Sequence, residues 1–336
     1  MKSILTALLC LIIVGESLAQ DSTEIISNAR NYIRQNNYSS AALILQQAIS
    51  EDSTVISYKK ELTWCYYYQD SFQLALNTML PIIAKGEADE QCYQIAGYVY
   101  KGMEKFKECE ALYENGLDKF PNSGPLYNDM GELLWLQKNV KAISYWENGI
   151  RLDPSFPANY YNAAVFYKIG NNVLWSILYG EIYVNMAPAG DKSSEIKRLL
   201  LEGYKKMFST LKSAVPADFN TPFAKKYLTH LFKQEELAGK SLNTDIVIMI
   251  RTRFILDWFN DKNDVLPFKL FDLHQNLLRE GLFVAYNQWL FGAVENPARY
   301  QRWTESHTKE YNSFIQYHQT NLFKMPPGQY YRVIAR

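Results

Sequence analysis

The chain contains 336 residues, in which 35 Lys and Arg balance 35 Asp and Glu, and 15% of all residues are aromatic. Balanced charge without a cluster of basic residues argues against a nucleic-acid-binding protein. Beyond the N-terminal segment no stretch is long and apolar enough to span a bilayer, which argues against an integral membrane span in the mature chain. The length is sufficient for two domains.

The N-terminal segment has the pattern of a secretory signal peptide. Lys2 supplies a positive charge, residues 4–14 form a short apolar run, and Ser17 and Ala19 are the small residues that a signal peptidase reads. We therefore expect cleavage before Gln20 and export to the periplasm or cell envelope, with outright secretion as a further destination. The alternative is an uncleaved membrane anchor.

Three cysteines follow the predicted cleavage site, at Cys65, Cys92 and Cys109. Their number is odd, and their spacing fits neither a disulfide framework nor a zinc site. We expect them to serve as small buried apolar residues.

Charge is unevenly distributed along the chain. Residues 20–190 contain 13 Lys and Arg against 19 Asp and Glu, a net charge of −6. Residues 191–336 contain 21 against 15, a net charge of +6. This shift predicts a domain boundary near residue 190 and suggests that the two halves attract each other.

Small residues recur at a fixed interval in the first half of the chain. They stand at Ala29, Thr63, Gly97, Gly131 and Ala164, with spacings of 34, 34, 34 and 33 residues. A small residue at such a position allows a second helix to cross closely. A second series follows eleven or twelve residues after the first, at Ala41, Ala75, Cys109, Ala142 and Ser176.

Residues 127–154, YNDMGELLWLQKNVKAISYWENGIRLDP, add a large apolar Trp146 and a terminating Pro154 to this pattern. The stretch resembles the tetratricopeptide repeat (TPR), a helix–turn–helix unit of about 34 residues. The resemblance implies an all-α, right-handed superhelical solenoid of about five repeats, in which neighbouring units share one core. The repeats are expected at residues 22–55, 56–89, 90–123, 124–156 and 157–190.

In this family the first helix of each repeat lines a concave surface. The outward positions here carry aromatic and basic residues, which suit an extended protein or peptide segment. The rings would cover apolar side chains of the partner, and the cations would meet its acidic groups. Alternatively, the C-terminal half or the curvature of the solenoid covers these rings. The candidate groove residues are Arg30, Arg34, Lys60, Trp64, Tyr67, Tyr68, Tyr98, Lys101, Asn128, Trp135, Tyr161 and Lys168.

The second half resembles no family. Residues 191–213 are expected to form a helix that covers the exposed end of the last repeat, because solenoids need such a cap. Residues 214–336 are expected to form an α-helical domain that follows a linker at 216–220. Its helices are expected from Pro222, over 242–259 (where a strand is the alternative), from Pro267 to Gly281, over 282–294, and from Pro297 to about Phe323, before an extended tail.

Candidates for catalysis are few. His307 and Glu310 would share one face of the last helix, but no second pair of ligands accompanies them. His274 lies near Asp272, although positions so close along a helix do not face each other. We therefore predict no catalytic residue, metal or cofactor, and a protein that is not an enzyme.

The sequence thus predicts an exported TPR adaptor that binds a protein or peptide segment. One alternative is an envelope enzyme whose C-terminal domain is catalytic, and this requires a deep polar pocket in residues 214–336 with converging Glu and His. The other is a structural subunit of an envelope secretion or assembly complex.

Overall fold

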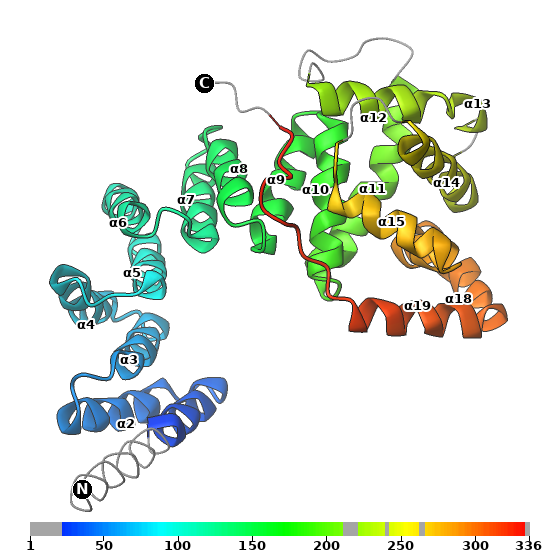
Figure 1. The fold of residues 1–336 in the computed structure, drawn as a ribbon. Helices are drawn as coiled ribbons and strands as arrows, with labels where there is room; N and C mark the ends of the chain where they lie inside the picture. The colour runs from blue at the N-terminus through cyan, green and yellow to red at the C-terminus, as the bar shows by residue number, and fades with distance from the viewer. Residues whose placement is uncertain (1–21, 211–220, 239–241, 262–265, 333–336) are drawn as a thin grey trace, which may run out of the picture. The chain divides into compact units, whose positions relative to one another are not determined.

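A computed structural model describes residues 22–210, 221–238, 242–261 and 266–332 (Figure 1). The predicted signal peptide and the predicted linker at 216–220 lie outside the described residues. The chain divides into two compact units, residues 1–121 (unit 1) and 122–336 (unit 2). The division falls after the third repeat, whereas the charge distribution placed a domain boundary near residue 190.

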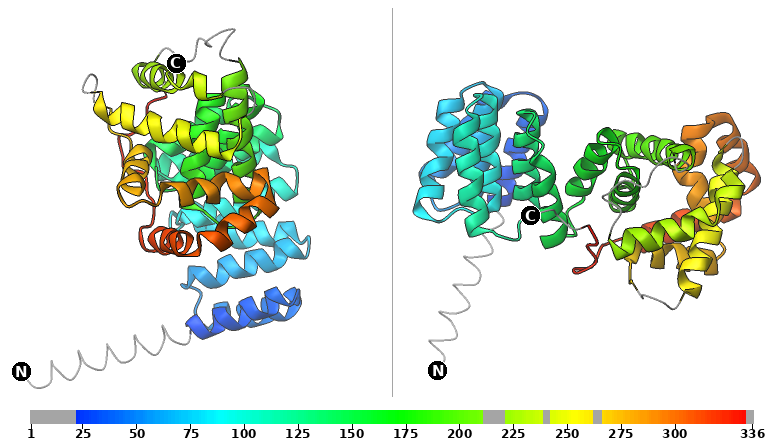
Figure 2. Two further views of the ribbon diagram at one scale, coloured as in Figure 1. Left: turned by 90° about the vertical axis from the view of Figure 1, so that its right-hand side faces the viewer. Right: turned by 90° about the horizontal axis from the view of Figure 1, so that it is seen from above.

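The described part of unit 1, residues 22–121, contains three helix pairs, and consecutive helices lie antiparallel (Figure 2). Each pair corresponds to one expected repeat. The helices are residues 22–34, α2 (Tyr38–Glu51), α3 (Ile56–Tyr68), α4 (Phe72–Lys85), α5 (Glu90–Gly102) and α6 (Phe106–Lys119).

Unit 2 begins with two further pairs and the helix that covers the last of them. These are α7 (Gly124–Leu136), α8 (Ala142–Leu152), α9 (Pro157–Ile169), α10 (Val173–Met186) and α11 (Asp191–Thr210). The helix α11 packs on α10, with Ile196 and Leu200 against Gly180, and the last three residues of the cap predicted over 191–213 lie outside the described residues. The absence of a side chain at Gly180 leaves room for this contact.

The same turn joins the two helices of every repeat. A residue with φ between 54° and 60° follows each first helix. The backbone amide of the residue after it donates a 2.9 Å hydrogen bond to the carbonyl oxygen five residues earlier, in the last turn of the helix. This is the Schellman arrangement, which satisfies carbonyl groups at a helix C-terminus. The residues with positive φ are Asn36, Asp70, Glu104, Lys138 and Asn171.

The small residues lie where the two helices of a repeat cross. A Cβ atom added to Gly97 would lie 2.2 Å from Tyr113 Oη, and one added to Gly131 would lie 2.3 Å from Trp146 Nε1. Tyr113 and Trp146 are buried. The helices therefore approach so closely that neither position accommodates a side chain without rearrangement.

Residues 244–260 form the helix expected over 242–259 rather than the alternative strand. The remaining helices of unit 2 show two differences from the predicted ones. The first is that the expected helix over 282–294 includes a π-helical turn at Gln288–Gly292. The helices are α12 (Pro222–Phe232), α13 (Glu235–Ala238), α14 (Thr244–Asn260), α15 (Lys269–Arg279), α16 (Phe283–Asn287), α17 (Ala293–Glu295), α18 (Pro297–Ser306) and α19 (Thr308–Thr320).

The second difference concerns the last helix, where the prediction of one continuous helix from Pro297 was wrong. The helix breaks at His307, which has φ −121° and ψ 32°. The Ser306 hydroxyl donates to the backbone of the preceding turn, and His307 stacks on Trp303 with ring centroids 4.6 Å apart. Such local hydrogen bonds compete with helix continuation. The face that His307 and Glu310 were expected to share is therefore not part of one unbroken helix.

The three cysteines are free and buried, as predicted. Burial raises the pKa of Cys65 to about 12, with a further contribution from the charge of Glu61. Burial likewise raises the pKa of Cys92 to about 11, and Asp89 adds to the shift. Because the thiolate is the reactive form, these thiols should be inert in the folded protein.

We expect iodoacetamide to leave Cys65, Cys92 and Cys109 unmodified in the native protein and to modify all three in urea. Peptide mapping by mass spectrometry measures this directly. Rapid modification of Cys65 or Cys92 in the native state would contradict the packing described here.

Candidate functional site

Five aromatic rings gather on one surface of unit 1. Trp64 has ring centroids 5.6 Å from Tyr67 and Tyr98 and 5.9 Å from Tyr68. Tyr68 also stacks on Tyr38 at 5.0 Å. We call these five residues the aromatic face. Tyr68 is 48% exposed and the other four are half-buried, so the rings are packed together yet still reach solvent.

The helical repeat explains this arrangement. Trp64, Tyr67 and Tyr68 lie three or four residues apart on α3, and such positions share a face. Leu62 and Cys65, on the other side of α3, are buried in the core. Aromatic pairs of this kind contribute about 0.5–1.5 kcal/mol each beyond their buried area. The rings therefore hold one another in place before any partner arrives.

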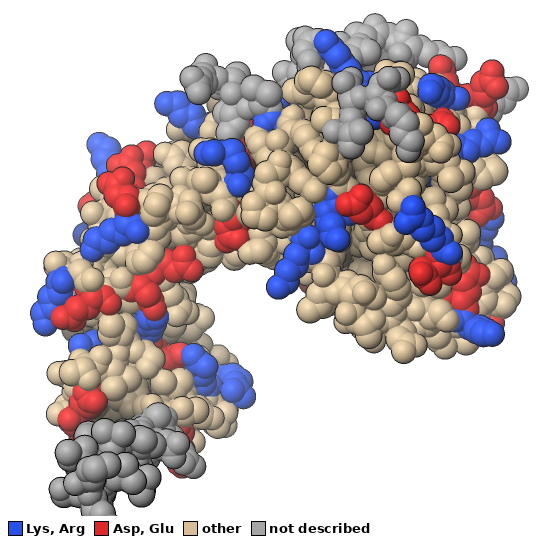
Figure 3. Space-filling view, in the orientation of Figure 1, with Lys and Arg blue, Asp and Glu red and all other residues tan. Residues whose placement is uncertain are grey.

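The positive charges near the aromatic face are largely balanced. Arg30 Nε donates to Glu61 Oε1 at 2.8 Å, and Lys60 forms an ion pair with Asp89. Lys101 Nζ lies 4.1 Å from the Tyr98 ring centroid, within cation–π range. The basic character expected from the sequence is thus offset by acidic residues of neighbouring helices. On the face shown in Figure 3, basic and acidic side chains are intermixed.

Arg34, a further candidate of unit 1, is exposed at the end of helix 22–34. The remaining four candidates lie in unit 2. Asn128 is buried: its Nδ2 donates to Glu132 at 3.1 Å, and its Oδ1 accepts from Asn162 Nδ2 at 2.8 Å. Asn128 therefore joins α7 to α9 and presents little of its own surface to a partner.

Trp135, Tyr161 and Lys168 are more accessible than Asn128. Trp135 is exposed and packs edge-on against a neighbouring ring of α9. Tyr161 donates a 2.7 Å hydrogen bond to Glu195, and Lys168 forms a 2.9 Å ion pair with Glu202. Both acidic partners belong to the capping helix α11. Tyr161 and Lys168 are thus joined to the cap by polar contacts, whereas Trp135 packs with Trp146 and Phe166.

A buried polar cluster in unit 2 was not predicted. Glu181 Oε1 accepts a hydrogen bond from Tyr286 Oη at 2.7 Å and lies 2.8 Å from His274 Nε2. It also forms an ion pair with Arg251, and Asn185 donates to Tyr286 at 2.8 Å. All five residues are at most 3% exposed. The cluster joins the last repeat, through α10, to α14, α15 and α16.

Burial opposes the charge on Glu181, but Arg251 and His274 outweigh it and lower the pKa of Glu181 to about 2. Burial lowers the pKa of His274, with Glu181 opposing the shift. A buried carboxylate is therefore held ionised by a guanidinium, while the imidazole favours its neutral form. Such a pair is costly to break, because removal of one partner leaves an uncompensated charge.

Glu and His converge around an open hollow lined by Glu280, His307 and Glu310, which is not the deep pocket that the enzyme hypothesis requires. They also converge in the buried cluster. However, Glu181 comes from the last repeat rather than from residues 214–336, and a substrate would need access to atoms that are almost fully buried. One oxygen of its carboxylate, Oε1, is already contacted by Arg251, His274 and Tyr286. The geometry supports a role in joining helices. Within the ranges that the structure describes, no group of three or more His, Cys, Asp or Glu is arranged to hold a metal ion.

Helix pairs at intervals of 33 or 34 residues, one shared turn and close crossings at small residues define the class of this protein. Its fold is an all-α helix-pair repeat of the TPR type with a C-terminal helical extension. Repeat proteins of this kind act through extended binding surfaces for other proteins.

Solved structures that the chain resembles include proteins described as TPR proteins. PilF of Pseudomonas aeruginosa is 14% identical, with a TM-score of 0.47, over 74% of this chain and 100% of that one. A thermophilic TPR protein of Thermus thermophilus is 14% identical, with a TM-score of 0.44, over 53% and 98%. YrrB, described as a TPR protein with an unusual peptide-binding site, is 17% identical, with a TM-score of 0.34, over 52% and 90%. No family model and no curated protein matches the chain.

Among the residues that the structure describes, none of the helices combines the length and the apolar character needed to cross a bilayer.

Proposed function

We propose that this protein is an exported TPR scaffold that holds an extended segment of a partner protein on the aromatic face of unit 1. The observation that carries the proposal is the preformed cluster of Tyr38, Trp64, Tyr67, Tyr68 and Tyr98, in which Tyr68 is 48% exposed. Rigid aromatic side chains are enriched among the residues that dominate binding energy, because they offer a large contact area at low entropic cost.

The pairing of charges indicates which segment fits this surface. Arg30 and Lys60 already have acidic partners, so a strongly acidic peptide would have to compete with Glu61 and Asp89. A segment rich in proline, aromatic or aliphatic side chains instead gains from burying apolar surface against the rings. Binding should therefore depend only weakly on salt, since screening acts mainly on exposed charges.

The double substitution Trp64→Ala and Tyr68→Ala tests this proposal. Affinity purification from crosslinked envelopes should recover the partner at no more than about one tenth of the wild-type amount, because ring truncation at a binding hot spot costs 2 kcal/mol or more. The matched control is Leu43→Ala with Leu74→Ala, which removes exposed apolar side chains from the second helices of the same unit.

Thermal melts of both variants accompany the purification. Undiminished recovery of the partner, together with a lowered melting temperature for the ring variant, would show that the rings serve packing alone and would refute the proposal.

A further inference from the structure

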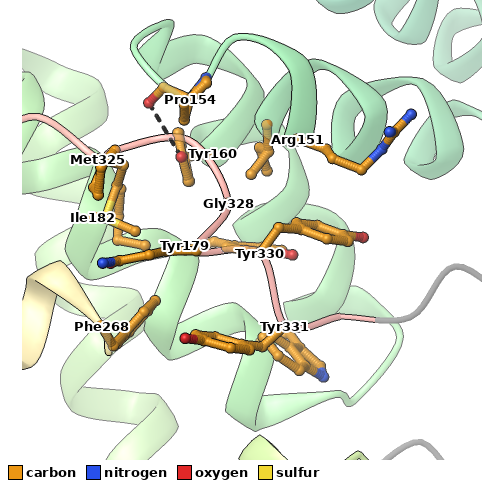
Figure 4. A pocket seen from close by; sticks show the side chains of 14 residues that line it. Arg151, Pro154, Tyr160, Tyr179, Ile182, Phe268, Met325, Gly328, Tyr330 and Tyr331 are labelled. Atoms are coloured by element: carbon orange, nitrogen blue, oxygen red, sulfur yellow. Dashed lines mark hydrogen bonds between the residues drawn. The ribbon is translucent and has the colours of Figure 1, made fainter. Parts of the chain in front are cut away.

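The last described segment of the chain, residues 323–332, is extended and lies on the repeats of unit 2 (Figure 4). Its apolar contacts come from α8, α9 and α10 and also from Phe223 of α12 and Phe268. We call the surface beneath it the tail groove, which comprises Glu147, Ile150, Tyr160, Tyr167, Tyr179 and Ile182.

Arg332 anchors the segment at one end of the tail groove. Its Nε lies 3.2 Å from Glu147 Oε1 and donates to Tyr167 Oη at 2.7 Å. Its guanidinium lies 4.9 Å from the Tyr167 ring centroid. Glu147 is only 2% exposed. The repeats thus provide a buried carboxylate, and the tail supplies the cation beside it.

Two further side chains fix the register of the tail. Tyr331 stacks on Phe223 with ring centroids 4.5 Å apart and an interplanar angle of 4°, and its hydroxyl donates to Pro267 O at 2.5 Å. Gln329 Oε1 accepts a 2.6 Å hydrogen bond from the Lys269 amide. The tail is therefore held by specific side-chain contacts, as a bound peptide would be.

The link between α19 and the tail is exposed to solvent. Leu322, between α19 and the tail, is 78% exposed, and no regular structure continues from α19 into residues 323–332 of the described chain. The tail can therefore leave the groove without unravelling a helix. In a vacated groove Glu147 would lack the guanidinium of Arg332, which opposes the rise in the pKa of Glu147 that burial causes. Another arginine would restore that stabilisation of the carboxylate.

We propose that the tail groove is a second peptide-binding site, specific for an extended segment of a partner protein in which a tyrosine directly precedes an arginine. Residues 323–332 are its intramolecular occupant, and a partner segment of the same chemistry displaces them. This site is independent of the aromatic face of unit 1. Because a tethered ligand has an effective concentration that reaches the millimolar range, a free peptide competes poorly until the tether is cut.

The test uses the full chain with a protease site inserted between Asn321 and Leu322. After folding, the chain is cut, and a fluorescent peptide with the sequence of residues 323–332 is added. Fluorescence anisotropy should show that the peptide enters the cut chain and binds the uncut chain at least tenfold more weakly. A peptide with Arg332→Gln should bind the cut chain at least tenfold more weakly than the natural sequence. Its matched control is Lys324→Gln, the same change of charge at an exposed position, which should stay within about twofold.

Equal binding of the two altered peptides, or a cut chain that keeps its circular dichroism spectrum but takes up no peptide, would overturn the proposal. A dimer of the uncut chain with exchanged tails would overturn it in favour of self-assembly. If cutting unfolds the protein, the uncut variant Tyr331→Ala with Arg332→Gln loosens the tail in place. This variant should take up the natural peptide, and failure to do so would equally refute the proposal.

Discussion

Replacement of Arg251 by Met should lower the free energy of unfolding of unit 2 by about 3–5 kcal/mol, the usual cost of leaving a buried charge without its partner. Glu181 would keep its contacts with His274 and Tyr286 but lose the guanidinium that holds it ionised. Urea unfolding monitored by circular dichroism measures the change.

Two variants make this result specific. Arg299→Met removes an ion pair with Asp245 in which both side chains are about half exposed, and it should change stability by less than about 1 kcal/mol. Adding Glu181→Gln to Arg251→Met removes the stranded charge and should restore part of the lost stability. If Arg251→Met lowers the free energy of unfolding no more than Arg299→Met does, the buried cluster does not contribute the predicted stability.

Gly97→Ala should destabilise unit 1 by about 3 kcal/mol, at the upper end of the range for overpacked cores. The new methyl group would lie 2.2 Å from Tyr113 Oη, and Tyr113 is fully buried. The sign of the change in stability is informative, because replacing Gly by Ala in an unhindered helix interior raises the free energy of unfolding by up to about 1 kcal/mol. Thermal or urea unfolding provides the measurement.

The control for this substitution is Gly170→Ala. Gly170 has φ −75°, and an added Cβ there meets only ordinary van der Waals contacts, the nearest at 3.6 Å. This variant should be neutral or slightly stabilising. Equal changes in the free energy of unfolding for Gly97→Ala and Gly170→Ala would mean that the helices of the third repeat do not cross as closely as described.

The repeats could be predicted from the sequence because their signal is local and periodic. Each small residue meets a partner within its own repeat, as Gly97 meets Tyr113 and Gly131 meets Trp146. The shared turn recurs with the same period, but Glu104 and Lys138 are not residues that favour a positive φ. Their identity alone therefore gave no indication of the turn, and only alignment of the repeats would have revealed it.

The contacts that organise unit 2 have no such period. Glu181 meets Arg251 across 70 residues and His274 across 93, and Arg332 reaches Glu147 across 185. These pairs depend on the packing of helices far apart in the sequence. The one available indication was a charged residue inside an otherwise apolar helix, as at Glu181 in α10, since such a residue is rarely buried without a partner.

Four rings of the aromatic face were among the candidate residues, but Tyr38 of α2 was not, and the pairing of the charges was not predicted. The positions of Trp64, Tyr67, Tyr68 and Tyr98 follow from helical spacing and the repeat period. The pairing of Lys60 with Asp89 depends on how neighbouring helices pack, and the fold had to be known before that contact was visible.

Site-specific photocrosslinking tests the central claim most directly. A photoreactive phenylalanine derivative at Tyr68 samples the aromatic face, and the same derivative at Leu43 samples an exposed site on α2 of the same unit. Mass spectrometry of the adducts should find one extended partner segment attached at position 68 and not at position 43. Equal labelling at both positions, or none at position 68 while the partner is bound, would contradict the assignment of the aromatic face as the binding surface.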